Sequence, residues 1–424
     1  MSLTLLLFFA ASLLIGAPVA VSLGLSAGLV IFLYDLPFTV MAQRAINTLD
    51  STPLLAVPLF ILAASLLGAT GVTTHLFELM RMVVGRIRGG MAHVNVLTSL
   101  IFSGMSGAAL ADIGALGGIQ IRQMEQQGYT KRFAAGLTIA AATIGPIFPP
   151  SIPLIIFATA AEVSTIRALL AGVVPALVVA IALMIQVAVM ARHYKLPRDD
   201  AQPSFTAFRK KTLISLPALL APVFLVGGMV SGFFGPTEAA GMTTAYAILI
   251  GLAIYRSLTW RSFLNCTRET VLSTANVLFV VASAALFAWV LTMDRVPAHA
   301  GEWLLSVSDN PLVLLLLLNV LLLVVGMFLE AIVAILIIAP IVAPALLQAG
   351  VPAEQLGVVF VLNLMLGLLT PPVGMSLYMV SIITKMPLSS IIRGVAPFYL
   401  SLFAALAAVT LIPALSTWLP NLVM

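Results

Sequence analysis

The sequence has very few charged residues: only 8% of its 424 residues are Asp, Glu, Lys or Arg, whereas 61% are hydrophobic. Soluble domains carry roughly 25% charged residues, so this scarcity excludes a soluble globular protein. The apolar residues form long continuous runs and do not alternate with polar ones. Since only helices and closed barrels can span the lipid core, we expect an all-α polytopic membrane protein embedded in a lipid bilayer.

Cysteine and histidine are also scarce, with one Cys and four His. The single cysteine, Cys266, excludes an intramolecular disulfide and a cysteine-based metal cluster. The net charge of +5 comes from a few short basic loops and gives no reason to expect a nucleic-acid partner. Most of these charges lie in three loops, at 81–88, 192–211 and 256–268; the second loop includes Lys195. The positive-inside rule places all three loops in the cytoplasm.

Apolar segments divide the chain into expected membrane crossings. They fall at 3–16, 17–34, 54–71, 93–123, 133–160, 167–191, 212–232, 236–255, 271–292, 311–348, 355–384 and 395–418. The segment 73–88 spaces apolar residues at helical intervals, which predicts an amphipathic helix in the membrane interface or, alternatively, a connecting helix packed on a neighbour.

An internal repeat appears when the chain is shifted by 222 residues. Gly104 then falls on Gly326, Gly145 on Gly367, and Pro149-Pro150 on Pro371-Pro372. The matched residues are mostly Gly and Pro, which determine backbone shape. The basic loops predict that the first copy starts outside and the second inside. Inverted repeats with broken helices are the architecture of secondary transporters, so we expect an elevator-type transporter.

Each copy is interrupted twice at membrane depth. The first interruption, at 103–107 and again at 325–327, predicts a re-entrant helical hairpin with its tip near the midplane, because each half is too short to span. The second, at 145–151 and 367–373, contains two consecutive prolines, which unwind a helix and leave carbonyl groups unpaired.

Unpaired carbonyls at this depth require a protein-lined cavity, and a hard cation would bind them. The pattern therefore predicts one cation at each hairpin tip, and Na⁺ is favoured because no midplane acidic pair suits a proton relay. The alternative is a pair of ordinary proline kinks. The candidate ligands are Ser103, Ser106, Gly145, Phe148 and Pro150 in copy one, and Val325, Gly326, Gly367, Thr370 and Pro372 in copy two; all but the two serines and Thr370 would act through backbone carbonyls.

The whole chain resembles the large membrane (M) subunit of tripartite ATP-independent periplasmic (TRAP) transporters. The resemblance rests on the proline-paired repeats, the Gly16-x-Pro18-x-Ala20 start, the segment Gly235–Ala239 (GPTEA) and the hairpin sequence SGMSG at 103–107. It implies Na⁺-coupled elevator transport of a small organic acid across the bacterial inner membrane, with no other cofactor. It also implies two protein partners: a small membrane (Q) subunit, expected as a separate polypeptide, and a periplasmic substrate-binding protein (P).

Several charged and hydroxyl side chains near the membrane interior are candidates for binding the acid. Arg295 offers a planar fork that matches a carboxylate, although it could instead pair with Asp294. Ser106 and Ser151 are expected to line the same cavity. Glu330 follows the second hairpin tip and would contact the substrate, tune the ion site or pair with the scaffold.

The predicted organisation follows from these segments. The expected scaffold comprises 1–72 and 212–294, and the arms are 73–90 and 295–310. The moving transport domain comprises 91–191 and 311–424, and 192–211 is a cytoplasmic loop. Two other functions remain possible: a stand-alone Na⁺- or H⁺-coupled carboxylate symporter and, more distantly, an intramembrane serine protease built on Gly104–Gly107 (GMSG). The protease requires a histidine base within reach, and the histidines lie at segment ends.

Overall fold

A computed structural model describes residues 1–193, 196–198 and 204–424, and in this part of the chain all regular structure is helical. Lys195 of the second basic loop lies outside the described residues. Seven helices or continuous helix pairs among the described residues are long and apolar enough to cross a membrane. The expected all-α membrane fold is therefore confirmed.

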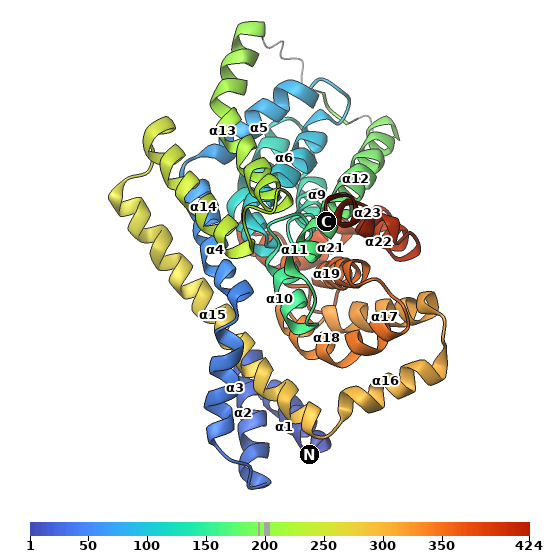
Figure 1. Cartoon of the computed structure of the whole chain (residues 1–424). Coiled ribbons are helices and arrows are strands. Elements are labelled where there is room, and N and C mark those ends of the chain that lie inside the picture. Colours follow the sequence, from blue (N-terminus) through green and yellow to red (C-terminus); the bar gives the residue numbers. More distant parts are fainter. Residues whose placement is uncertain (194–195, 199–203) are drawn as a thin grey trace.

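The helices predicted to form the scaffold, called the scaffold helices below, come from two separate stretches of the chain (Figure 1). The long helix α15 packs on α2, α3 and α4, and α14 packs on α4. These helices are α1 (Ser2–Leu14), α2 (Val19–Leu33), α3 (Thr39–Leu49), α4 (Thr52–Ala69), α13 (Phe205–Val230), α14 (Pro236–Leu249) with the π-helical turn η2 (Ile250–Ile254), and α15 (Trp260–Met293).

The Gly16-x-Pro18 pattern separates the first two helices. Gly16 adopts φ 89°, a left-handed conformation that ends α1, and Pro18 precedes the first residue of α2. Glycine tolerates this conformation and proline favours a helix start, so the sequence stops one helix and begins the next within four residues. The division of 3–34 into two helices is therefore confirmed.

The two repeats have the same order of helices. The first contains α6 (Gly90–Ser106), α7 (Ala109–Asp112), the π-helical turn η1 (Ile113–Gly117), α8 (Gly118–Gln126), α9 (Lys131–Ala142), α10 (Ile152–Ala160), α11 (Thr165–Ala171) and α12 (Val173–His193). The second contains α17 (Pro311–Gly326), α18 (Ala331–Gln348), α19 (Ala353–Leu369), α20 (Met375–Thr384), α21 (Leu388–Val395), the 3₁₀ turn η3 (Ala396–Phe398) and α22 (Tyr399–Leu411), followed by α23 (Ala414–Val423).

The register of 222 residues holds in the structure: α9 begins at Lys131 and its counterpart α19 at Ala353. Contacts between the repeats also occur in exchanged pairs. Helix α10 packs on α18, and its counterpart α20 packs on η1; α11 packs on α19, and α21 packs on α9. Exchange of this kind is what an approximate two-fold axis between the copies produces. Its direction relative to the membrane stays a prediction.

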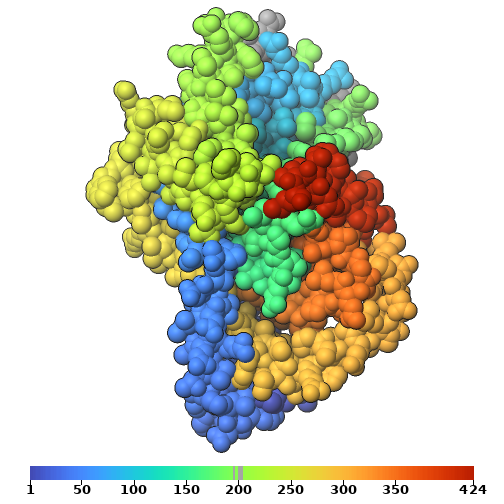
Figure 2. All heavy atoms as spheres, viewed as in Figure 1, coloured from blue at the N-terminus to red at the C-terminus, as the bar shows by residue number. Residues whose placement is uncertain are grey.

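Two connecting helices join the scaffold to the repeats. The first, α5 (Val72–Val84), packs on α6 and α13; the second, α16 (Val296–Val307), packs on α18. In Figure 2 α16 runs around the lower edge of the molecule towards the second repeat. They occupy the stretches predicted to be arms, and their role as arms stays a prediction; the half-buried first connecting helix contacts neighbouring helices on two sides.

Three helices extend beyond or lie outside the expected apolar segments. Helix α13 already begins at Phe205, within the stretch 192–211 predicted as a loop, and α15 begins at Trp260, within the third basic loop. The helix α3 lies between the expected crossings 17–34 and 54–71, where no helix was predicted. Hydroxyl caps explain the two early starts: Ser204 and Thr259 accept hydrogen bonds from the backbone N–H groups of Ala207 and Ser262.

Candidate functional site

The first hairpin tip lies against the Pro-Pro turn of its own repeat. Helix α6 ends at Ser106, and Gly107 follows with φ 66°. A Cβ at Gly107 would overlap the carbonyl oxygen of Pro150, and the N–H of Ile152 donates to the Gly107 carbonyl over 3.4 Å. The close approach of tip and turn, expected from the repeat pattern, is therefore present.

The Pro-Pro turn interrupts the helix between α9 and α10, and its Pro149–Pro150 peptide bond is cis. Ser151 is fully buried and organises the turn: its hydroxyl donates to the Pro146 carbonyl and accepts from the Leu154 N–H at 3.1 Å. Ser151 therefore caps α10, and it is not among the residues that line the pocket described below.

The predicted cation ligands of the first repeat gather at this contact. Ser106 donates to Asp112, and Asp112 lies directly over the Cα of Gly145. Ser103 is fully buried and donates to the Ser99 carbonyl at 2.5 Å, which leaves its oxygen lone pairs free. Within the described chain, the carbonyls of Gly145, Phe148 and Pro150 accept no backbone hydrogen bond. The donor set is rich in oxygen and suits a hard cation.

In the second repeat the helices cross more closely. A Cβ at Gly326 would lie 3.2 Å from the Cα of Gly367, so glycine at both positions permits the crossing of α17 and α19. The Thr370 hydroxyl donates to the Leu366 carbonyl at 2.7 Å, and the Pro371–Pro372 bond is again cis. The carbonyl of Gly367 accepts a backbone hydrogen bond, unlike that of its counterpart Gly145. The carbonyl of Val325 also accepts, as does that of its counterpart Ser103, but a carbonyl oxygen has a second lone pair.

A cavity of about 870 Å³ separates the scaffold from both repeats. Scaffold helices α4 and α15 form one wall, and the first hairpin, the Pro146 and Pro153 region, and the start of α18 form the other. Ser106 and Glu330, both predicted substrate contacts, line it. The carboxylate of Glu330 also accepts from the Ile332 N–H at 3.0 Å and so caps α18. This volume suits a small molecule.

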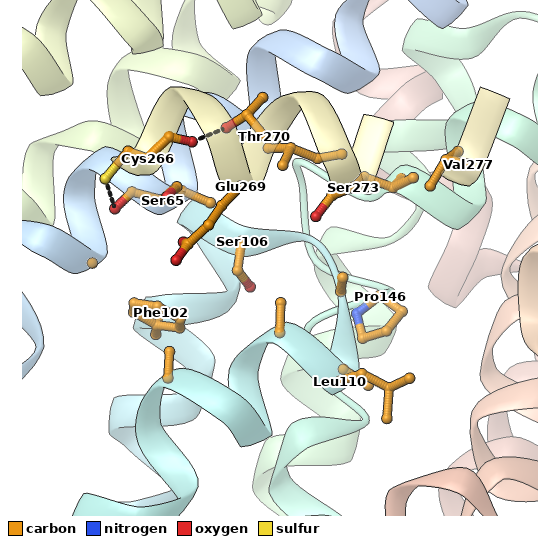
Figure 3. A pocket seen from close by; sticks show the side chains of 18 of the residues that line it. Ser65, Phe102, Ser106, Leu110, Pro146, Cys266, Glu269, Thr270, Ser273 and Val277 are labelled. Carbon is orange, nitrogen blue, oxygen red and sulfur yellow. Dashed lines mark hydrogen bonds between the residues drawn. The ribbon is translucent and has the colours of Figure 1, made fainter. Parts of the chain in front are cut away.

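The α15 wall carries polar residues that the sequence analysis missed. Ser262, Glu269 and Ser273 face the pocket at helical spacing, and Figure 3 shows Glu269 and Ser106 projecting into it from opposite walls. Cys266 donates to the Ser65 carbonyl at 3.6 Å, which joins α15 to α4. The sequence signal for this wall was a row of polar residues at helical spacing along α15. The row begins inside the stretch that the sequence analysis interpreted as a basic loop.

The pocket lining contains two carboxylates, Glu269 and Glu330, and no Lys or Arg. Arg295 is not part of it: the residue precedes α16 with φ 55°, at the junction between α15 and the second arm. Its neighbour Asp294 instead accepts from the Ser2 N–H at 2.7 Å and pairs with the terminal amine at 3.5 Å. A cargo contact by Arg295 would therefore require movement of the arm.

Two copies of one helix order beside a pocket are typical of a transporter, and comparison of the sequence with known families shows which kind of transporter this is. Residues 6–415 match the family described as tripartite ATP-independent periplasmic transporter, DctM component. The chain belongs to the TRAP transporter DctM family. The resemblance drawn from the proline-paired repeats and the SGMSG hairpin is confirmed.

Two relatives illustrate the match to the DctM family. The chain is 40% identical over 384 residues to the sialic acid TRAP transporter large permease protein SiaM of Vibrio cholerae, covering 90% of this chain and 89% of that protein. It is 38% identical to the C4-dicarboxylate TRAP transporter large permease protein DctM of Pseudomonas aeruginosa, covering 94% of each. Both relatives are named as permeases, and membership of this family places the chain among inner-membrane transport proteins.

A solved structure shows a similar fold. The Alcanivorax borkumensis YdaH transporter superposes with a TM-score of 0.59 at 17% identity, covering 91% of this chain and 88% of that one. At this identity the likeness concerns the fold alone, and it supports the arrangement of helices described above.

Proposed function

We propose that this TRAP large permease moves a small organic acid into the cell by Na⁺-coupled elevator transport. The pocket carries the proposal, because it lies at the boundary between the scaffold helices α4 and α15 and the two hairpins. A cargo held there contacts both bodies, so sliding one past the other changes the side from which it is accessible. Family membership supports a carboxylate cargo, since relatives are named for sialic acid and C4-dicarboxylates.

Na⁺ supplies the driving force in this proposal. Both tips place carbonyl and hydroxyl oxygens beside a Pro-Pro turn, and the candidate ligands are those predicted from the repeat. Each Na⁺ that enters at 100 mV contributes roughly 2.3 kcal/mol before its concentration gradient is counted. Two ions would support roughly a 2,000-fold gradient of a neutral solute.

We propose that the acid is bound without a basic side chain, because the pocket lining in the described part of the chain contains no Lys or Arg. Ser106 and Glu330 are the proposed cargo contacts from the repeats, with Ser151 positioning the turn and Arg295 acting only if the arm moves. A bound cation beside the pocket would offset the charge of the cargo. Glu269, on the scaffold wall, would favour an acid that also carries hydroxyl or amine donors.

The proposed partners are a separate small membrane subunit and a periplasmic binding protein that delivers the acid. Uptake of labelled sialic acid or a C4-dicarboxylate into proteoliposomes tests the complete proposal. We expect uptake only with the binding protein and an inward Na⁺ gradient. Equal uptake in Na⁺-free buffer with a proton gradient contradicts Na⁺ coupling, and uptake without a binding protein favours a stand-alone symporter.

A further inference from the structure

Asp112 is a buried acid that the proposed mechanism has not used. It lies just past the first hairpin tip, at the end of the short helix α7, and only 2% of its surface is exposed. Ionisable residues at membrane depth are costly and usually mark ion or substrate pathways. Since Asp112 does not line the pocket, its role lies inside the first repeat.

The two carboxylate oxygens of Asp112 have different surroundings. Oδ1 accepts a hydrogen bond from the Ser106 hydroxyl, whereas Oδ2 is buried and has no hydrogen-bond partner. No basic side chain pairs with Asp112 in the described part of the chain. A buried carboxylate with a bare oxygen is strongly unfavourable unless a charge of opposite sign lies beside it.

The bare oxygen points to a specific place. A Cβ added to Gly145 would overlap Oδ2 of Asp112, so the carboxylate fills the space that a side chain would take above the turn. Gly145 and Ser106 are both proposed cation ligands of the first repeat. The carboxylate thus contacts one ligand and hydrogen-bonds the other.

The second repeat has no acid at the position equivalent to Asp112; its own acid near the tip, Glu330, falls opposite Ala108. The 222-residue register places Ala334 opposite Asp112 and Phe328 opposite Ser106. There the counterpart of Gly145, Gly367, packs directly on Gly326. The two tips therefore share a backbone shape but carry their acids at different positions: Asp112 lies over the turn of the first repeat, whereas Glu330 begins α18 in the second.

We propose that Asp112 supplies the negative charge of the first cation site, so that this site is electrically neutral when filled. This rests on the proposed Na⁺ coupling and extends it. The first cation is held by the protein's own carboxylate and binds without cargo. The proposed ligands of the second site are neutral oxygens, so its counter-charge would come from Glu330, which follows the second tip, or from the carboxylate of the cargo.

Equilibrium dialysis of ²²Na⁺ against the purified full-length chain tests this assignment without a transport assay. Asp112→Asn keeps the shape and removes the charge. We expect affinity for one ion to fall about 100-fold or more, because a unit charge a few ångströms from a cation dominates binding at the effective dielectric of a protein. Glu125→Gln, the same type of change at the end of the same hairpin, is the matched control and leaves binding unchanged.

The outcomes separate this inference from the function on which it rests. If the wild-type chain binds Na⁺ and Asp112→Asn binds it equally well, Asp112 is not the counter-charge, while Na⁺ coupling stands. Absence of Na⁺ binding by the wild type overturns both. If Asp112→Asn does not elute as a folded protein, Asp112→Glu is measured instead, because it keeps the negative charge but shifts its position. Retained Na⁺ binding with altered affinity supports the charge role. Wild-type affinity for both ions contradicts it.

Discussion

Single hydroxyl groups distinguish the two proposed ion sites at the residue scale. Thr370 presents a hydroxyl at the second turn, whereas its counterpart Phe148 offers only a carbonyl. We expect Thr370→Ala to raise the Na⁺ concentration needed for half-maximal uptake by about 10- to 150-fold, as the loss of one hydrogen bond to a charged group would. Ser106→Ala should have a similar effect at the first site.

Phe148→Ala serves as the control for the Thr370 and Ser106 variants. It removes packing but keeps the carbonyl, so the Na⁺ titration should remain unchanged even if the protein is less stable. Na⁺-dependent uptake into proteoliposomes measures all three variants. If Ser106→Ala and Thr370→Ala both titrate like the wild type, the tips are not ion sites and the proline turns are structural kinks.

Glycine at the close contacts is required for steric reasons, and this gives a second residue-scale prediction. Gly367→Ala would bring a Cβ within 2.5 Å of the Gly326 backbone, which cannot move away as a flexible side chain can. We expect a clear loss of thermal stability in detergent. At Gly68, in a helix with nothing within 4 Å, alanine should instead be neutral or stabilise by about 0.5–1 kcal/mol. Similar melting temperatures for the two variants would contradict the close crossing.

At the scale of the helices, the repeat made much of the fold predictable. Both hairpins and both broken helices are present because Gly and Pro act on the local backbone, and a fixed offset of 222 residues reveals them twice. Helix α3 and the first turns of α13 and α15 were missed, since hydropathy does not report polar helical turns. The pocket wall on α15 was missed with them.

The candidate site was predictable to a similar degree and for the same reason. Ser106 and Gly145, expected to come together through the backbone breaks, both contact Asp112 in the structure. The contact of Asp112 with both could not be read from the sequence, because it depends on how α7 folds back across the turn. The pocket likewise depends on packing between α4 and α15, which are some 200 residues apart.

One ion pair joins helices of the two repeats and gives an element-scale prediction. Arg167 of α11 pairs with Glu354 of α19, whose side chain is only 12% exposed, and also donates to Asn421 of α23. Arg167→Met should cost about 1–3 kcal/mol, because it leaves a half-desolvated carboxylate without its partner. Lys211→Met breaks the more exposed pair with Glu78 and should cost about 0–1 kcal/mol.

Thermal unfolding of the Arg167→Met and Lys211→Met variants in the same detergent provides the comparison. The expected order is a larger drop in melting temperature for Arg167→Met than for Lys211→Met. Equal drops would mean that the pair between α11 and α19 does not hold the repeats together more strongly than a surface pair does.

At the scale of the whole molecule, the elevator predicts that the hairpins change depth against α4 and α15. Ala64 of α4 and Leu110 of the first hairpin both line the pocket, so each can be replaced by cysteine to test this movement. In a Cys266→Ser background, a short bifunctional thiol reagent should link them and stop uptake, and release of a cleavable reagent should restore it. Transport at the normal rate while the link is intact would contradict sliding of these two walls.

The single native thiol has a practical consequence. Cys266 is only 5% exposed, faces the pocket and holds α15 to the Ser65 carbonyl of α4. Alkylation of the unmodified protein can therefore occur at one place only, and its rate reports directly on the pocket wall. A membrane-impermeant maleimide added from one side and then the other would show which compartment the pocket opens to, and slower alkylation in the presence of an acid would identify the cargo without any transport assay.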